Sequence, residues 1–293
     1  MPSLPRHPDP DPSRRQAEVE RRGMLDHGDV TALRALLTAD PASATAGLEN
    51  WRDHPLGASP LGYVAMLRYD TATNRWRDVP GAANLARELL AAGAPVDGDQ
   101  PPPVETPLIT AASYGDAAVA LVLIEAGADL EARAAADSGG VPGGTALLHA
   151  AVFGMTDVVD LLVRAGARVP DDVLAAAAGT LTTAPADEGT RLLALMMAAH
   201  HQRLTVLDVL LDAGTPVDAV EPVWGRQALR LAAREGRPDA VRHLLARGAD
   251  PTLRDDEGRD SLALCRQGRA EYEDPSAHDE VERLLLAALA ARG

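Results

Sequence analysis

The chain has 293 residues, of which 46% are hydrophobic and only 3% aromatic, so its core has to be built mainly from Ala, Leu and Val. Its 28 basic and 43 acidic side chains give a formal net charge of −15, which repels nucleic-acid phosphates and predicts no nucleic-acid partner. All of the basic residues are Arg, which excludes chemistry that requires a lysine, such as a Schiff base or a P-loop.

The composition of the chain also predicts a cytoplasmic setting. The single cysteine, Cys265, has no partner for an internal disulfide. Residues 1–15 are rich in Pro and charge without the apolar segment of a signal peptide, and we expect a disordered tail there. The longest apolar stretch, near residues 192–199, is far shorter than the roughly 20 residues that cross a bilayer. We therefore expect no membrane association.

The first expected helices lie in residues 16–41, where a polar segment precedes an apolar one. A long connection, 42–58, leads to a second helix pair that starts at Ser59-Pro60-Leu61 and ends at Gly93-Ala94. Ser before Pro is typical of a helix start, because the hydroxyl accepts a hydrogen bond from the first turn and Pro fits its first position. Residues 68–79 form an insertion that splits this pair.

From residue 106 onwards the chain repeats one pattern. Residues 106–129, 145–167 and 227–250 each contain an Ala-Ala pair, a first Gly, and a second Gly 12 residues later. Ala pairs permit neighbouring helices to approach closely, and Gly after a helix accepts left-handed backbone. Residues 193–214 repeat the pattern less regularly, with Gln202 in place of the first Gly. These features predict a series of similar helix pairs.

This pattern resembles the ankyrin repeat, a helix pair with a Thr-Pro-Leu-His-like start and a Gly-Ala-Asp end, which Thr106-Pro107-Leu108 and Gly127-Ala128-Asp129 match. The resemblance implies an all-α solenoid of antiparallel helix pairs with β-hairpin-like finger loops. It implies a single domain over residues 16–293. Within it we expect an N-terminal cap at 16–41, about five internal repeats in 59–250 and a C-terminal cap at 258–293.

Four insertions interrupt the order of helix pairs, at 42–58, 68–79, 133–144 and 170–190. The third is a Gly-rich finger, and the fourth contains a short helical stretch at 171–178. The first two carry aromatic and His side chains that we interpret as secondary pocket candidates: Trp51, His54, Tyr69 and Trp76. The alternative is that they plug an end of the solenoid, where a neighbouring repeat is missing.

The resemblance also implies that the first helix of each pair faces a concave groove. Residues at three positions of each unit, together with the finger residue Trp224, are our binding candidates: Tyr63, Tyr114, His149, Phe153, Met197, His200, His201, Trp224 and Arg234. For each His the alternative is a structural role at a helix end. Adjacent histidines project about 100° apart on a helix, unlike the i, i+4 spacing of metal ligands, so no metal site is expected.

Two functions from different classes agree with these features. The first is a binding or scaffold module that recognises a protein or peptide in the groove, as the resemblance implies. The second is a lyase, isomerase or cyclase that acts on a small apolar substrate without a cofactor. In that enzyme His149 and His200 would be the acid and base, and Tyr114 would donate a hydrogen bond. An open groove would favour the first function, and a closed pocket the second.

Overall fold

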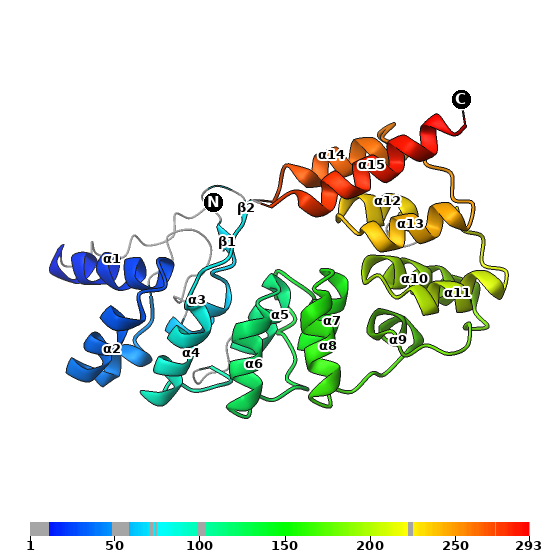
Figure 1. Ribbon diagram of the computed structural model, residues 1–293. Coiled ribbons are helices and arrows are strands. Elements are labelled where there is room, and N and C mark those ends of the chain that lie inside the picture. The colour runs from blue at the N-terminus through cyan, green and yellow to red at the C-terminus, as the bar shows by residue number, and fades with distance from the viewer. Residues whose placement is uncertain are drawn as a thin grey trace, which may run out of the picture.

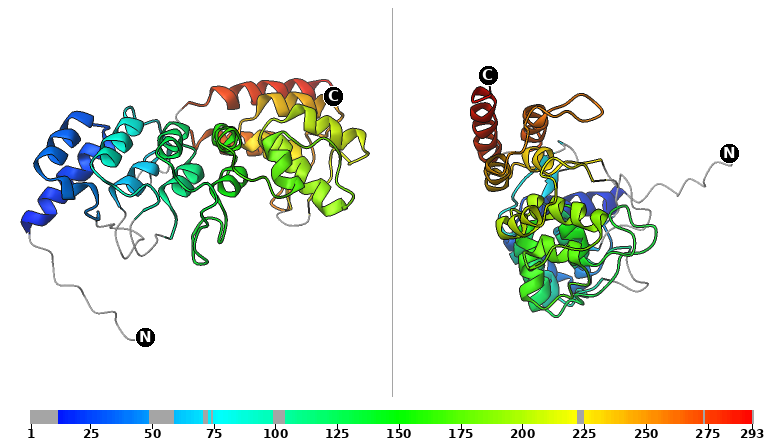
Figure 2. Two further views of the ribbon diagram at one scale, coloured as in Figure 1. Left: turned by 90° about the horizontal axis from the view of Figure 1, so that it is seen from below. Right: turned by 90° about the vertical axis from the view of Figure 1, so that its right-hand side faces the viewer.

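The computed structural model describes residues 12–48, 59–70, 73, 75–98, 104–221, 225–272 and 274–292, with side chains from residue 19 onwards. Antiparallel helix pairs stack side by side along the chain (Figure 1). The described residues contain one short two-stranded hairpin besides the helices, so the expected all-α solenoid is confirmed. The finger at residues 133–144 projects from one side of the stack (Figure 2).

The N-terminal part of the stack contains two helix pairs, and a β-hairpin separates the helices of the second. The elements are α1 Pro12–Asp26, α2 Val30–Ala39, the 3-10 helix Pro41–Ala44, α3 Pro60–Ala65, β1 Tyr69–Asp70, β2 Arg75–Trp76 and α4 Ala82–Ala91. Helix α1 begins at Pro12 and not at residue 16. The expected boundary is wrong because the Arg- and Glu-rich segment offers no apolar pattern that marks its first turn.

The central part consists of two regular pairs and one additional helix. The elements are α5 Pro107–Tyr114, α6 Ala117–Glu125, α7 Ala146–Val152, α8 Thr156–Arg164 and α9 Asp172–Ala178. The expected capping is confirmed, since the hydroxyl of Thr106 accepts a hydrogen bond from the amide of Ile109 at 3.3 Å. Helix α9 contacts α7, α8 and α10, so the insertion at 170–190 adds a helix to the stack.

The C-terminal part contains three more pairs. The elements are α10 Glu188–His200, α11 Leu204–Asp212, α12 Ala228–Arg234, α13 Pro238–Ala246, α14 Ser261–Arg269 and α15 Ser276–Ala290. Helix α10 begins at Glu188, before the expected start at residue 193, because Asp187 caps it by accepting from the amide of Thr190 at 2.7 Å. Gln202 adopts the left-handed conformation of the Gly that it replaces, with φ of 54°, so the turn is retained.

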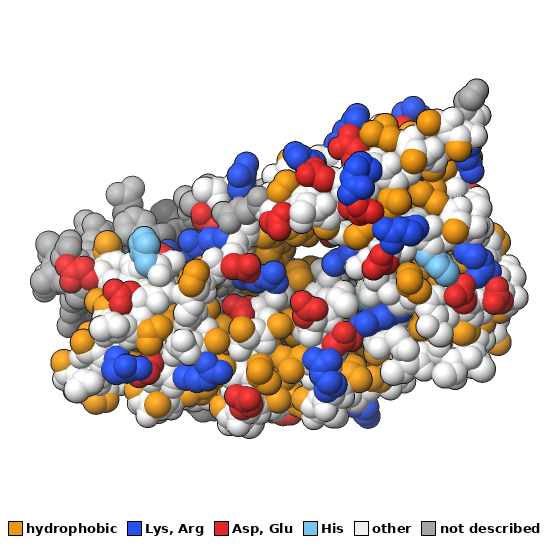
Figure 3. All heavy atoms as spheres, in the orientation of Figure 1, with side chains coloured by type: hydrophobic (Ala, Val, Ile, Leu, Met, Phe, Trp, Pro, Cys, Tyr) orange, Lys and Arg blue, Asp and Glu red, His pale blue; other side chains and the backbone are white. Residues whose placement is uncertain are grey.

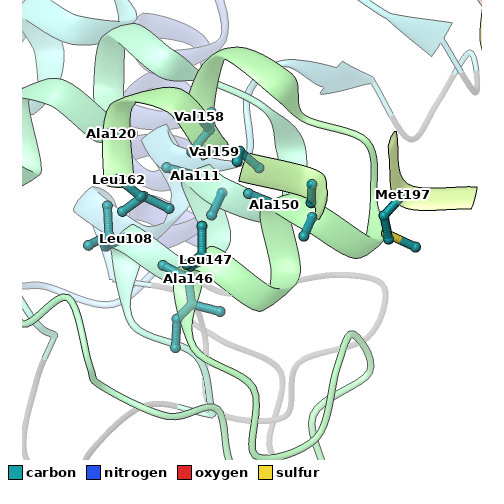
Figure 4. Packing of buried hydrophobic residues seen from close by; sticks show 14 of the residues in the cluster. Leu108, Ala111, Ala120, Ala146, Leu147, Ala150, Val158, Val159, Leu162 and Met197 are labelled. Carbon is teal, nitrogen blue, oxygen red and sulfur yellow. The ribbon is translucent and has the colours of Figure 1, made fainter. Parts of the chain in front are cut away.

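Small residues between the first helices allow the stack to close. All eight alanines of the four Ala-Ala pairs are buried, as the repeat register predicts: Ala111, Ala112, Ala150, Ala151, Ala198, Ala199, Ala232 and Ala233. Leucines and valines fill the space beside them, and Figure 4 shows part of this core, with Leu108, Leu147 and Leu162 next to the alanines. The core is therefore a continuous layer along the solenoid.

We expect Ala151→Leu to lower the free energy of unfolding by about 1 to 3 kcal/mol, because the added carbons have no space between the closely packed helices. Urea unfolding followed by circular dichroism measures this loss. The matched control is Ala35→Leu, at an exposed position of α2, which we expect to leave stability nearly unchanged. Equal stability of the Ala151→Leu protein and the wild type would contradict the register.

Candidate functional site

Three aromatic side chains meet at one end of the concave face. The hairpin that follows α3 brings Tyr69 and Trp76 together, with their ring centroids 5.0 Å apart and an edge-to-face angle of 62°. Tyr114, at the end of α5, lies 6.2 Å from Tyr69 and 6.4 Å from Trp76. Burial, assisted by Glu105 and Tyr69, raises the pKa of Tyr114, so its hydroxyl stays protonated and is a hydrogen-bond donor at neutral pH. We name Tyr69, Trp76 and Tyr114 the aromatic cluster.

The hairpin also reaches the far end of the solenoid. The amide of Trp76 donates to the carbonyl of Glu271 at 3.3 Å, and Trp76 forms a parallel bridge with Tyr272. Glu271 and Tyr272 belong to the connection between α14 and α15, so a contact joins the second helix pair to the last one (Figure 1). The concave face is therefore bridged, and the space-filling view shows a hollow between the two arms (Figure 3).

Ionic and aromatic contacts hold the α14–α15 connection in place. One guanidinium nitrogen of Arg234 lies 3.0 Å from a carboxylate oxygen of Glu271, and another contacts Glu235. The ring of Tyr272 lies 5.1 Å from that of His278, whose Nε2 donates to the carbonyl of Arg234 at 3.0 Å. The side chain of Arg234, one of the predicted binding residues, thus supports the point where the hairpin makes contact.

His149 is buried inside the stack and does not face the groove. Its Nε2 donates to the carbonyl of Val141 at 3.0 Å, and its Nδ1 is 2.8 Å from the hydroxyl of Ser113. Gly140 and Gly144 approach the ring so closely that a Cβ at either would lie 2.9 Å from it. Burial lowers the pKa of His149. The side chain therefore connects the finger to α5 and α7, a structural role that leaves no ring nitrogen for a ligand.

His200 and His201 are also buried, where α10 meets the turn between α7 and α8. The Nε2 of His201 donates to the carbonyl of Ala151 at 2.8 Å, and its Nδ1 is 3.0 Å from the hydroxyl of Thr156. The ring of His200 packs on Gly154, and neither of its nitrogens has a partner among the described residues. Burial lowers the pKa of His201 to about 4 and that of His200 well below its ordinary value.

The remaining predicted residues have different locations. Phe153 has 38% of its surface exposed, whereas Met197 is buried in the stack. Tyr63 faces the N-terminal pair, because its hydroxyl donates to Asp26 at 2.6 Å and Arg22 lies over its ring. Trp51, His54 and Trp224 lie outside the described residues. The structure thus brings Tyr69, Trp76, Tyr114 and Arg234 to the bridged groove and places the three histidines inside the protein.

Sequence reasoning did not identify Glu271 and Tyr272 as groove residues. They lie where the last unit departs from the repeat pattern, because this unit lacks the turn Gly that the pattern has at that point. One signal was present, since Tyr272 is one of only four tyrosines in the chain. In the described part of the chain, His, Cys, Asp and Glu form no group of three or more that could hold a metal ion. No described helix has the length and apolar character required to span a bilayer.

Comparison with known proteins identifies the family. A family model for ankyrin repeats in three copies matches residues 80–172 and 174–255, more than half of the chain. The chain belongs to the ankyrin-repeat family. The ankyrin repeat and KH domain-containing protein mask-1 of Caenorhabditis elegans is 32% identical in an alignment of 198 residues, and the match covers 60% of this chain and 7% of that protein. This chain therefore spans only a small fraction of that relative.

Two solved structures resemble the fold. The human ASB11 ankyrin repeat domain has 23% identity and a TM-score of 0.37, with 79% of this chain and 98% of that chain covered. A chain in the structure of the complex of the predatory endopeptidase Bd0816 from Bdellovibrio bacteriovorus with immunity protein Bd3460 has 22% identity and a TM-score of 0.35. The similarity covers 78% of this chain and 98% of that one. Ankyrin repeats are protein–protein interaction modules, and a binding role follows for this chain.

Proposed function

We propose that the protein binds an extended segment of a partner protein in its concave face, beside the contact between the aromatic cluster and the α14–α15 connection. The observation that carries this proposal is the convergence of Tyr69, Trp76 and Tyr114 where the hairpin bridges the groove. Partly exposed aromatic side chains supply much of the energy of protein interfaces, because they bury large areas with little loss of conformational freedom.

The bridge restricts the shape of the partner. A folded domain that lay along the first helices would have to displace the contact between Trp76 and Glu271, whereas an extended segment passes beside it. Arg234 and the exposed ring of Phe153 provide a charged and an apolar contact for such a segment. Arg is also enriched among the residues that dominate interface energies. An extended peptide is thus the partner class that fits this surface.

The geometry does not favour the alternative of an enzyme. Its acid and base would be His149 and His200, which are buried in the stack. Both ring nitrogens of His149 are engaged, and His200 packs on the backbone of Gly154. General acid–base catalysis requires a group within hydrogen-bond reach of the substrate. Of the proposed trio, Tyr114 alone lies at the groove.

The test compares a groove variant with a matched surface variant. The tagged full-length protein is cross-linked in its native cells, the captured partner is identified, and its Kd is measured with purified proteins. We expect Phe153→Ala to weaken binding by about 30-fold, as for a hot-spot residue. Leu286→Ala, which changes an exposed side chain on α15, should leave the Kd unchanged. Equal affinities for Phe153→Ala and the wild type would refute binding in the groove.

A further inference from the structure

The second helices form the outer face of the solenoid, and one of them differs from the rest. Six residues before the closing Gly, four of these helices carry a charged side chain: Arg87, Asp160, Asp208 and Arg242. Helix α6 has Leu121 there, with 39% of its surface exposed. One turn earlier the other four helices have Asn84, Asp157, Thr205 and Asp239, whereas α6 has Ala118. The outer face of α6 is therefore apolar where its counterparts are polar.

A shallow groove lies beside this apolar face. It occupies about 450 Å³ between α6 and α8, and its lining includes Ala117, Ala118, Leu121 and Leu161. Hydrophobic side chains gather over these two helices at the lower edge of the molecule (Figure 3). An exposed apolar stretch of a helix is normally covered, because exposed apolar area is unfavourable in water. Within the described chain nothing covers the outer face of α6.

Two opposite charges border the groove at the two ends of α8. Asp157 lies in the first turn and Arg164 in the last, about 10 Å apart along the helix. Both side chains are exposed, and neither makes an ion pair or hydrogen bond with any described residue. Asp160, between them, is by contrast paired with Arg203 at 2.5 Å. The patch thus combines the apolar face of α6 with an unpaired acid at one end of α8 and an unpaired base at the other, and Arg203 neutralises the Asp160 that lies between them.

We propose that a second copy of this chain covers this face and forms a two-fold symmetric dimer through α6 and α8. A two-fold axis across the middle of the two helices reverses their direction in the partner. It places Leu121 against Leu121 of the partner subunit, and Asp157 against Arg164 of the partner subunit. Because the rotation exchanges the two ends, both charge pairs form at once. The small side chain of Ala118 permits close approach of the two helices.

The charge pattern favours a second copy over an unrelated partner. The whole chain carries a formal net charge of −15, so two copies repel each other in general. In the proposed orientation, the acid and base of one patch attract the base and acid of the other at short range. The general repulsion between the two copies is screened beyond about 8 Å at physiological ionic strength. The outer helices on either side carry charges instead of apolar centres, which confines the contact to α6 and α8.

Sedimentation equilibrium of the full-length protein over a wide concentration range tests the dimer. We expect a monomer–dimer equilibrium in the wild type. Leu121→Asp should raise its dissociation constant by about 30-fold or more, as for the loss of a central interface contact. Leu286→Asp, at an exposed position on α15, is the matched control and should leave the constant unchanged. A wild type that remains monomeric at every concentration overturns the proposal.

Charge exchange tests the orientation. Asp157→Arg and Arg164→Asp each place like charges opposite one another, so each should weaken the dimer. The double variant Asp157→Arg/Arg164→Asp restores both pairs and should recover the wild-type dissociation constant. All the altered side chains are exposed, so thermal unfolding should confirm that the variants fold. A dimer that persists in Leu121→Asp, or a double variant no better than the single ones, would show that copies associate elsewhere or in another orientation.

Discussion

Lowering the pH from 6.5 to 4 is expected to reduce the free energy of unfolding by about 3 kcal/mol through His201 alone. Burial lowers the pKa of His201 to about 4, and Arg237 and Arg203 act in the same direction. In the unfolded chain the imidazole regains its ordinary pKa of 6.5, so the unfolded state takes up the proton first as the pH falls. The contribution of His201 is therefore complete above about pH 6.5 and is lost as the pH approaches 4.

The pKa of His200, which burial also lowers, adds to this loss in the same direction. Urea unfolding at a series of pH values, for the wild type and His201→Gln, isolates the His201 contribution from that of the carboxylates. Gln retains a neutral N–H donor for the carbonyl of Ala151 but does not titrate in this range. Between pH 6.5 and pH 4 the wild type should lose about 3 kcal/mol more of its free energy of unfolding than the variant does. Parallel pH profiles would show that His201 does not titrate as a buried neutral group.

Replacement of His149 by Ala is expected to lower the free energy of unfolding by about 2 to 4 kcal/mol. The imidazole is completely buried and bonds to both Ser113 and the carbonyl of Val141. Its removal takes one hydrogen bond from each of these groups, opens a cavity under the finger, and releases the finger from α7. The carbonyl of Val141 still accepts from the amide of Gly144 at 2.9 Å, and the hydroxyl of Ser113 can donate to the carbonyl of Ile109, so the cavity accounts for most of the expected loss.

Urea unfolding of three variants measures this role. Leu162→Ala, in the core of α8, provides the reference loss of about 2 to 5 kcal/mol. His149→Ala should approach that value, whereas Phe153→Ala should stay well below it because the ring is partly exposed. Hydrogen exchange should also become faster for the amides of Gly140 and Gly144 in His149→Ala. A loss for His149→Ala no larger than that for Phe153→Ala would mean that the finger does not depend on this contact.

The register of the repeats could be predicted from the sequence because short-range patterns encode it. Thr106 before Pro107, the buried Ala pairs and the closing glycines each satisfy a local requirement of one helix pair, whatever its neighbours are. The same reasoning located the hairpin insertion, with Tyr69 and Trp76, and the extra helix near 171–178. It missed the early start of α10, because the cap at Asp187 is only one of several polar residues in that loop.

The site depended on contacts between segments far apart in the chain. Whether a His in a first helix faces the groove or the interior is set by the loop that covers it, and the finger at Val141 covers His149. The bridge from Trp76 to Tyr272 follows from the accumulated curvature of the intervening helix pairs. Small rotations between successive helix pairs add up along a solenoid. Local sequence patterns therefore do not reveal which distant segments of the chain come into contact. Closure of the groove is for this reason a property of the folded chain.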